Sequence, residues 1–153
     1  MGAVQQQVWS TVKSRILVVD DNLDNVRSLA LLLETMGHEI EYAINATVAM
    51  HIAPQFKPDI IFLDLLLPDA HGAEVCSEIR ALPGLSKTRI FAVTASSRMI
   101  DHQIALDAGC DDVLRKPLSP ETYERLIAGG ASRRKLREFM SSEAEKKGCH
   151  PLG

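Results

Sequence analysis

Ile16-Leu17-Val18-Val19-Asp20-Asp21 is a hydrophobic run that ends in two carboxylates. Three later stretches repeat this design, because each begins with apolar residues and ends in a residue that carries a charge or a hydroxyl group. They are Ile60-Ile61-Phe62-Leu63-Asp64, Ile90-Phe91-Ala92-Val93-Thr94 and Val113-Leu114-Arg115-Lys116-Pro117. If these stretches are parallel strands of one sheet, their carboxyl ends meet at one edge. The sequence therefore predicts a polar site at that edge.

Helical periodicity separates the hydrophobic runs, so strand and helix signals alternate from residue 14 to about 128. This alternation indicates an α/β fold, in which a doubly wound parallel sheet of five strands carries helices on both faces. Helix caps are expected at Asn22 or Asp24, at Ser96 or Ser97, and at Ser119 before Pro120. The expected strands are 15–19, 39–43, 59–63, 89–93 and 112–115, and the expected helices are 22–36, 46–55, 72–82, 96–108 and 120–128.

The composition is that of a globular protein, with 46% hydrophobic and 24% charged residues in 153. A net charge of -3 gives no reason to expect a nucleic-acid partner. No apolar stretch approaches the roughly 18 residues of a membrane span, so no membrane association is expected. Three scattered cysteines, an odd number, favour free thiols in a reducing compartment, which predicts a cytoplasmic protein.

The two ends of the chain differ from its centre. Residues 1–13 form a polar N-terminal tail, and residues 14–128 are the expected domain. After Gly129-Gly130, residues 129–153 form a basic tail or a short extra helix that we expect to fray. Nothing after residue 128 is long enough for an output domain, so the sequence suits either a stand-alone protein or a fragment of a larger one.

The acidic groups at the predicted edge suit a magnesium ion. Asp20, Asp21 and Asp64 supply carboxylate oxygens, which Mg²⁺ prefers, and the backbone carbonyl of Leu66 can add another ligand. Asp64 follows a buried strand, where a carboxylate is costly unless a cation or hydrogen bonds compensate it. It is the candidate nucleophile, since aspartate carboxylates accept phosphoryl groups. The alternative is that these residues only cap helices or turn into solvent.

Other groups complete the candidate site. The ammonium of Lys116 can stabilise the charge of phosphoryl oxygens, and Pro117 permits a cis peptide that would fix how the lysine enters the pocket. Thr94 offers a hydroxyl group, and Ala95 beside it leaves the pocket open. Taken alone, Thr94 is more simply an ordinary strand residue and Lys116-Pro117 a strand end without function.

The combination of Val18-Val19-Asp20-Asp21-Asn22, Asp64 with Pro68 and Gly72, Val93-Thr94-Ala95 and Lys116-Pro117 resembles the receiver domain of two-component response regulators. The resemblance covers about residues 14–128 and implies a flavodoxin-like sheet with strand order 2-1-3-4-5. It implies that Asp64 takes a phosphoryl group from a histidine kinase or a phosphotransfer protein. Asp21 and Asp64 would bind Mg²⁺ directly and Asp20 largely through water, while Thr94 and Lys116 would contact the phosphoryl oxygens.

One position departs from the family pattern. Family members often carry Tyr or Phe three residues before the lysine, and this chain has Val113 there. In the family, that ring turns inward when the threonine moves toward the phosphate. Valine cannot report in this way, so switching by ring rotation is in doubt, and Val113 is more simply a sheet residue.

These features predict a phosphoacceptor signalling domain, at most capable of slow self-phosphorylation from small donors and of autodephosphorylation. Its partners would be a kinase or phosphotransfer protein and a downstream protein, with a homodimer left open. The alternative is an aspartyl-phosphate phosphatase or phosphotransferase of the dehalogenase type, but Leu66 stands where such enzymes carry a second aspartate. A nucleotide-binding Rossmann module is discounted, because no glycine-rich loop follows the first strand.

Overall fold

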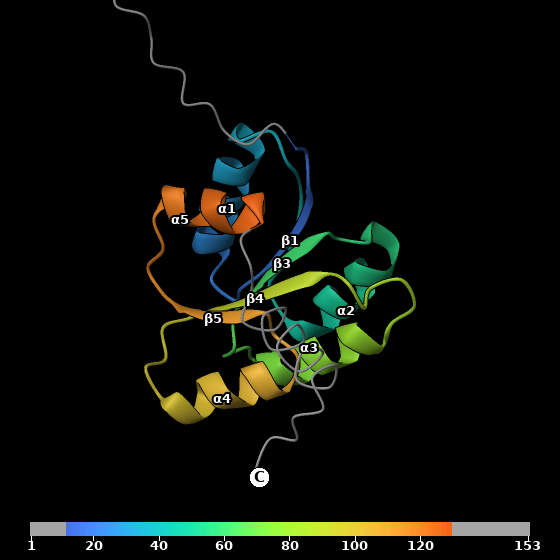
Figure 1. Ribbon diagram of the computed structural model, residues 1–153, viewed down its shortest axis with the longest axis vertical. Coiled ribbons are helices and arrows are strands. Elements are labelled where there is room, and N and C mark those ends of the chain that lie inside the picture. Colours follow the sequence, from blue (N-terminus) through green and yellow to red (C-terminus); the bar gives the residue numbers. More distant parts are fainter. Residues whose placement is uncertain (1–11, 130–153) are drawn as a thin grey trace, which may run out of the picture.

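A five-stranded sheet organises residues 12–129, which are the residues described by the computed structural model (Figure 1). All strand pairs are parallel, and the order is β2-β1-β3-β4-β5. Both the α/β class and the strand order predicted above are therefore confirmed. The elements are β1 (Arg15–Val19), α1 (Leu23–Thr35), β2 (Glu39–Ala43), α2 (Ala46–Phe56), β3 (Ile60–Leu63), α3 (Gly72–Ala81), β4 (Arg89–Thr94), α4 (Met99–Asp107), β5 (Asp112–Arg115) and α5 (Pro120–Ala128).

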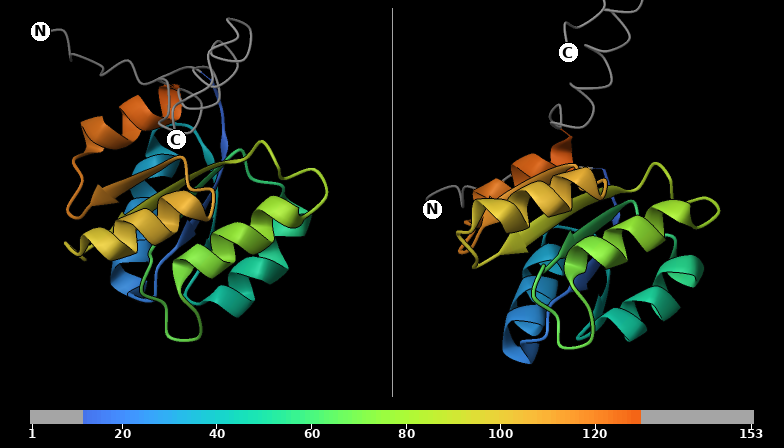
Figure 2. Two further views of the ribbon diagram at one scale, coloured as in Figure 1. Left: turned by 60° about the horizontal axis from the view of Figure 1, so that its bottom comes forward. Right: turned by 90° about the horizontal axis from the view of Figure 1, so that it is seen from below.

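The central strands β1, β3 and β4 are buried on both faces of the sheet. Helices α1 and α5 cover one face, and α2, α3 and α4 cover the other (Figures 1 and 2). Side chains of a strand alternate between faces, so the central strands need apolar residues at every position. Accordingly, Leu17 and Leu63 pack toward α2 and α3, whereas Val18 and Phe62 pack toward α1 and α5. This burial explains the continuous hydrophobic runs of β1, β3 and β4.

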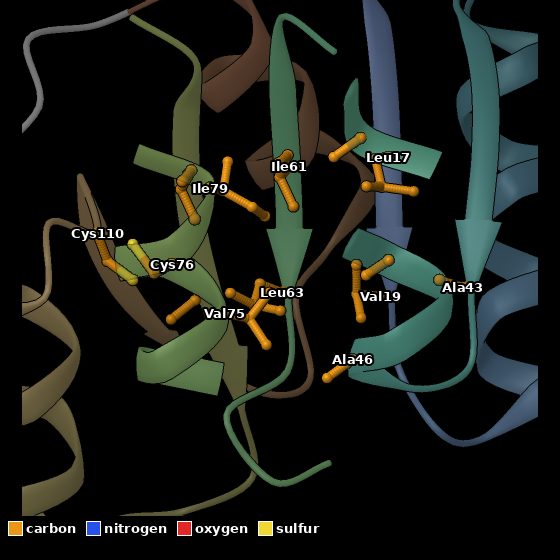
Figure 3. Packing of buried hydrophobic residues seen from close by; sticks show 14 of the residues in the cluster. Leu17, Val19, Ala43, Ala46, Ile61, Leu63, Val75, Cys76, Ile79 and Cys110 are labelled. Atoms are coloured by element: carbon orange, nitrogen blue, oxygen red, sulfur yellow. The ribbon is translucent and has the colours of Figure 1, made fainter. Parts of the chain in front are cut away.

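Two of the three cysteines lie in the core between the sheet and α3. Cys76 and Cys110 are buried and not disulfide-bonded, as the sequence predicted for these two, and Figure 3 shows their sulfur atoms side by side. The hydrogen bond with Cys76 and burial raise the pKa of the Cys110 thiol far above its usual value. This thiol is therefore protonated at neutral pH and packs as a small apolar group. Cys149 lies outside the described residues.

Helix ends agree with the sequence except in one place. Asn22 caps α1, Ser119 caps α5 before Pro120, and Gly129 ends α5 with a φ of 91°. The fourth helix, however, begins at Met99 and not at Ser96 or Ser97. The start was predicted wrongly because Ser96 forms a turn that precedes the helix: its hydroxyl accepts the backbone N–H of Arg98 at 3.2 Å and donates to the Asp101 carboxylate at 2.7 Å.

No helix within residues 12–129 is long and apolar enough to cross a membrane. The basic tail or extra helix predicted for residues 129–153, apart from Gly129, and most of the polar N-terminal tail lie outside the described part of the chain.

Candidate functional site

The acidic residues predicted to converge do lie together at the carboxyl edge of the sheet. The backbone N–H of Asp20 donates to Ala43 at 3.1 Å, and that of Asp64 donates to Val19 at 2.9 Å. Because these bonds extend the hydrogen-bond ladders of the strands by one residue, the backbone of both aspartates is fixed by the sheet. Carboxylate oxygens of Asp20, Asp21 and Asp64 all lie within 4.8 Å of one another. This is a donor set that Mg²⁺ prefers.

Lys116 joins this cluster from the end of β5. Its Nζ lies 2.5 Å from Oδ2 of Asp20 and 3.1 Å from Oδ2 of Asp64. Burial opposes its positive charge, but the hydrogen bonds to the two carboxylates outweigh that effect and raise the pKa of Lys116 above its usual value. The lysine is therefore charged at neutral pH and offsets part of the carboxylate repulsion.

The three aspartates differ in their exposure to solvent. Asp20 and Asp64 are 7% and 9% exposed, whereas Asp21 faces solvent. A cation or a phosphoryl group entering from the side of Asp21 would meet two carboxylates whose water shell is largely replaced by protein. Electrostatic interactions are stronger in such surroundings than in bulk water.

The loop after Asp64 is fixed by short-range contacts. The backbone N–H of Leu66 donates to Oδ1 of Asp64 at 3.1 Å, and that of Gly72 donates to the carbonyl of Leu65 at 2.7 Å.

The same loop is also joined to α2. Asp69 accepts hydrogen bonds from the backbone of Ala46 and Thr47 at the start of that helix. These bonds lower the pKa of Asp69. The loop is thus tied to α2, a connection that the sequence alone did not reveal.

Thr94 lies at the end of β4, next to the lysine. Its side chain is fully buried, its carbonyl accepts the backbone N–H of Lys116 at 2.9 Å, and its hydroxyl accepts the backbone N–H of Ser96 at 3.2 Å. Ala95 is exposed beside it. The peptide bond between Lys116 and Pro117 is cis.

Val113, at the position of the family aromatic, is a residue of the sheet. It pairs with Ala92 of β4 and packs against the core on the α3 side. Its side chain has no polar tip and therefore cannot exchange hydrogen-bond partners between the core and the solvent.

A cavity of about 470 Å³ opens between α1, α5 and the sheet, with Asp20, Asp64 and Lys116 at one end. Tyr123 of α5 lines it and packs edge-on against Phe62, with 5.0 Å between ring centroids. Burial raises the pKa of Tyr123 to about 12, and the charge of Lys116 acts against this. Tyr123 was not among the predicted site residues, although its spacing of four residues from the apolar Ile127 is typical of the inner face of a helix.

Comparisons with known proteins agree with this geometry. Residues 16–128 match the family model described as the response regulator receiver domain. The DNA-binding response regulator MtrA of Mycobacterium tuberculosis is 33% identical over 111 residues, which cover 72% of this chain and 47% of MtrA. The signal transduction histidine-protein kinase BarA of Escherichia coli is 32% identical over 118 residues, covering 77% of this chain and 13% of BarA. The chain thus spans about half, or less, of the length of these curated relatives.

Solved structures resemble the chain over most of its length. A two-component response regulator from Clostridium difficile superposes with a TM-score of 0.70 at 30% identity, covering 83% of this chain and 98% of the other. The chemotaxis response regulator CheY4 of Vibrio cholerae superposes with a TM-score of 0.71 at 25% identity, covering 76% and 98%.

Proposed function

Since this chain belongs to the response regulator receiver domain family, which serves two-component signalling, we propose that Asp64 is its phosphoacceptor and that phosphorylation requires Mg²⁺. The observation that carries the proposal is the contact of one ammonium, that of Lys116, with both Asp20 and Asp64. A neutralising cation at the nucleophile is what the reaction needs, because the incoming phosphoryl group is itself negatively charged.

The proposed step is an in-line displacement. A carboxylate oxygen of Asp64 forms a bond to the phosphorus of a phosphohistidine, the phosphorus–nitrogen bond breaks, and its electron pair stays on the imidazole, which then binds a proton. Asp20, Asp21, Asp64 and the backbone carbonyl of Leu66 would hold a magnesium ion, which would offset the negative charge of the phosphoryl oxygens. The backbone N–H of Leu66, at 3.1 Å from Oδ1, orients the attacking carboxylate.

The product places a group with a charge of about -1.5 to -2 in a partly buried pocket. Nζ of Lys116 lies 3.1 Å from Oδ2 of Asp64, so it reaches the phosphoryl oxygens when one of them replaces a carboxylate oxygen as its partner. The Thr94 hydroxyl donates a hydrogen bond to a phosphoryl oxygen, which draws the end of β4 toward Asp64. This movement changes the position of α4 and with it the surface offered to a partner.

The phosphoryl donor in this proposal is a sensor histidine kinase or a histidine phosphotransfer protein. The receiver domain, residues 14–128, then binds a downstream protein. A cytoplasmic location is part of the proposal, because three scattered cysteines, an odd number, favour free thiols.

The direct test is chemical phosphorylation. With acetyl phosphate and Mg²⁺, the protein is expected to gain one acid-labile phosphate, and peptide mapping after borohydride reduction is expected to find it at Asp64. Removing divalent ions with EDTA is expected to stop the labelling, and added Mg²⁺ to restore it. A phosphate at another residue, or labelling that persists without divalent ions, would refute the assignment.

Gly72 offers a second test, because it packs against the backbone of the phosphoacceptor. A Cβ at this position would lie 2.8 Å from the Cα of Leu65 and still closer to the carbonyl oxygen of Asp64. Gly72→Ala must displace this loop, so we expect a loss of about 1–3 kcal/mol of stability and slower labelling at Asp64. Gly37→Ala is the control: its φ of 99° is strained for alanine, but it has no atoms within 4 Å of the added Cβ, and it should lose stability while keeping its labelling rate.

A further inference from the structure

Two loops meet beside the phosphoacceptor, and a chain of side-chain contacts joins them. One loop connects β3 to α3 and follows Asp64, and the other connects β4 to α4 and follows Thr94. Their meeting point is Asp101 in the first turn of α4, whose side chain is only 12% exposed. Asp101 has a different carboxylate oxygen directed to each loop.

On the β4–α4 side, Ser96 connects Thr94 to Asp101. The Ser96 backbone N–H donates to Oγ1 of Thr94 at 3.2 Å, and its hydroxyl donates to Oδ2 of Asp101 at 2.7 Å. The hydrogen bond from Ser96 lowers the pKa of Asp101 against the effect of burial, so the carboxylate is ionised and a strong acceptor. A displacement of Thr94 is therefore transmitted to Asp101 through a single residue.

On the β3–α3 side, the contact is His71. Its Nδ1 accepts the backbone N–H of Ala73 at 3.1 Å, so in the neutral ring the proton lies on Nε2. Within residues 12–129, this buried Nε2 has no hydrogen-bond partner. It lies 3.8 Å from Oδ1 of Asp101, which is too long for a hydrogen bond. A donor this close to a carboxylate would gain a charge-assisted hydrogen bond if the two groups moved together.

We propose that His71 and Asp101 close into a hydrogen bond when Asp64 is phosphorylated, and that this bond holds the β4–α4 loop in its displaced position. The inference rests on the proposed function. Thr94, drawn toward the phosphoryl group, brings Ser96 and Asp101 toward the start of α3, where Gly72 packs on Asp64 and His71 precedes it. The two loops then perform the positioning that a ring at Val113 would otherwise provide.

Three variants separate this role from a merely structural one. His71→Asn keeps the helix cap, because asparagine is among the strongest N-cap residues, but its side chain is too short to reach Asp101. Asp101→Ala removes the acceptor from both loops. Asp107→Ala is the matched control, since it removes an exposed carboxylate from the same helix. In the described part of the chain, that carboxylate accepts a hydrogen bond from Gln103 and contacts neither loop through a hydrogen bond.

The measurement is hydrogen exchange of backbone amides 96–101 in the full chain, before and after phosphorylation by acetyl phosphate with Mg²⁺. His71→Asn is expected to speed exchange roughly tenfold in the phosphorylated state and to leave the resting state unchanged, because the bond is open there. Asp101→Ala is expected to speed exchange in both states, and Asp107→Ala in neither. In protein with ¹⁵N-labelled histidine, the Nε2 proton of His71 should become protected from exchange only on phosphorylation.

Failure of this inference differs from failure of the proposed function. A wild-type protein that carries phosphate on Asp64, yet shows the same Nε2 signal in both states, would overturn the inference and leave the function intact. So would His71→Asn with wild-type exchange in the phosphorylated state. A wild-type protein that takes no phosphate would overturn the proposed function, and the role of His71 and Asp101 in switching with it.

Discussion

Asp64→Asn is expected to abolish phosphorylation by acetyl phosphate, reducing the acid-labile phosphate from one per chain to none. The amide lacks the anionic oxygen that must attack phosphorus, and it removes one of the carboxylates available to Mg²⁺. The fold should survive the change, because asparagine has the same shape and its oxygen still accepts the Leu66 N–H. Lys116 also keeps its partner Asp20 at 2.5 Å. Phosphate analysis with a thermal melt of the same sample tests both statements.

Asp59→Asn provides the matched control for this experiment. Asp59 immediately precedes β3, so it lies at the opposite edge of the sheet from Asp64, and its carboxylate accepts the backbone N–H of Arg15 at 2.9 Å. The change removes the same charge from the same strand region and preserves that hydrogen bond, so full labelling is expected. Phosphate retained by the Asp64 variant would show that another residue is the acceptor, whereas phosphate lost from the Asp59 variant would trace the effect to general electrostatics.

The parts of the site that could be predicted from sequence are those set by strand ends. This holds for Asp20, Asp64 and Lys116, each of which follows a strand. Parallel strands bring their carboxyl ends to one edge of the sheet, and this does not depend on the conformations of the loops. The hydrophobic runs of β1 and β3 were readable because both faces of the sheet are covered, which removes polar positions from the pattern. Local patterns of this kind need no knowledge of distant contacts.

The parts that could not be predicted depend on contacts between residues far apart in the chain. The start of α4 was misplaced because the Ser96 side chain, which was predicted to cap the helix, binds the Arg98 N–H and the Asp101 carboxylate in a turn that precedes the helix. His71 lies near Asp101 only because α3 and α4 are neighbours on one face of the sheet, and thirty residues of chain separate them. The link from Asp69 to α2 is likewise formed only in three dimensions. Such polar side chains are ordinary loop or helix residues in the sequence.

Asp111→Ala is expected to cost the largest loss of stability among the substitutions considered. The Asp111 side chain is fully buried, and its Oδ2 lies 2.7 Å from Nη2 of Arg80 and accepts the backbone N–H of Ile90 at 2.8 Å. Removing the carboxylate leaves a guanidinium that is 14% exposed without its counter-charge and leaves one buried N–H unpaired. Breaking a buried ion pair from one side costs about 3–5 kcal/mol, which is a large part of the total stability of a typical domain. For a chain of this size, that loss corresponds to a fall in Tm of roughly 6–20 °C.

A variant of Arg80 shows how much of this loss comes from leaving a charge unpaired and how much from losing the ion pair itself. Arg80 also donates to the carbonyls of Gly109, Ser86 and Thr88, so it holds the segments around β4 and β5 together as well as neutralising Asp111. Combining Arg80→Met with Asp111→Ala leaves no charge buried alone, so the double variant should lose less stability than the two single losses added together. Urea unfolding of the four proteins measures this coupling. Losses that simply add would mean that the two side chains act independently, and that the contact between them contributes little to the fold.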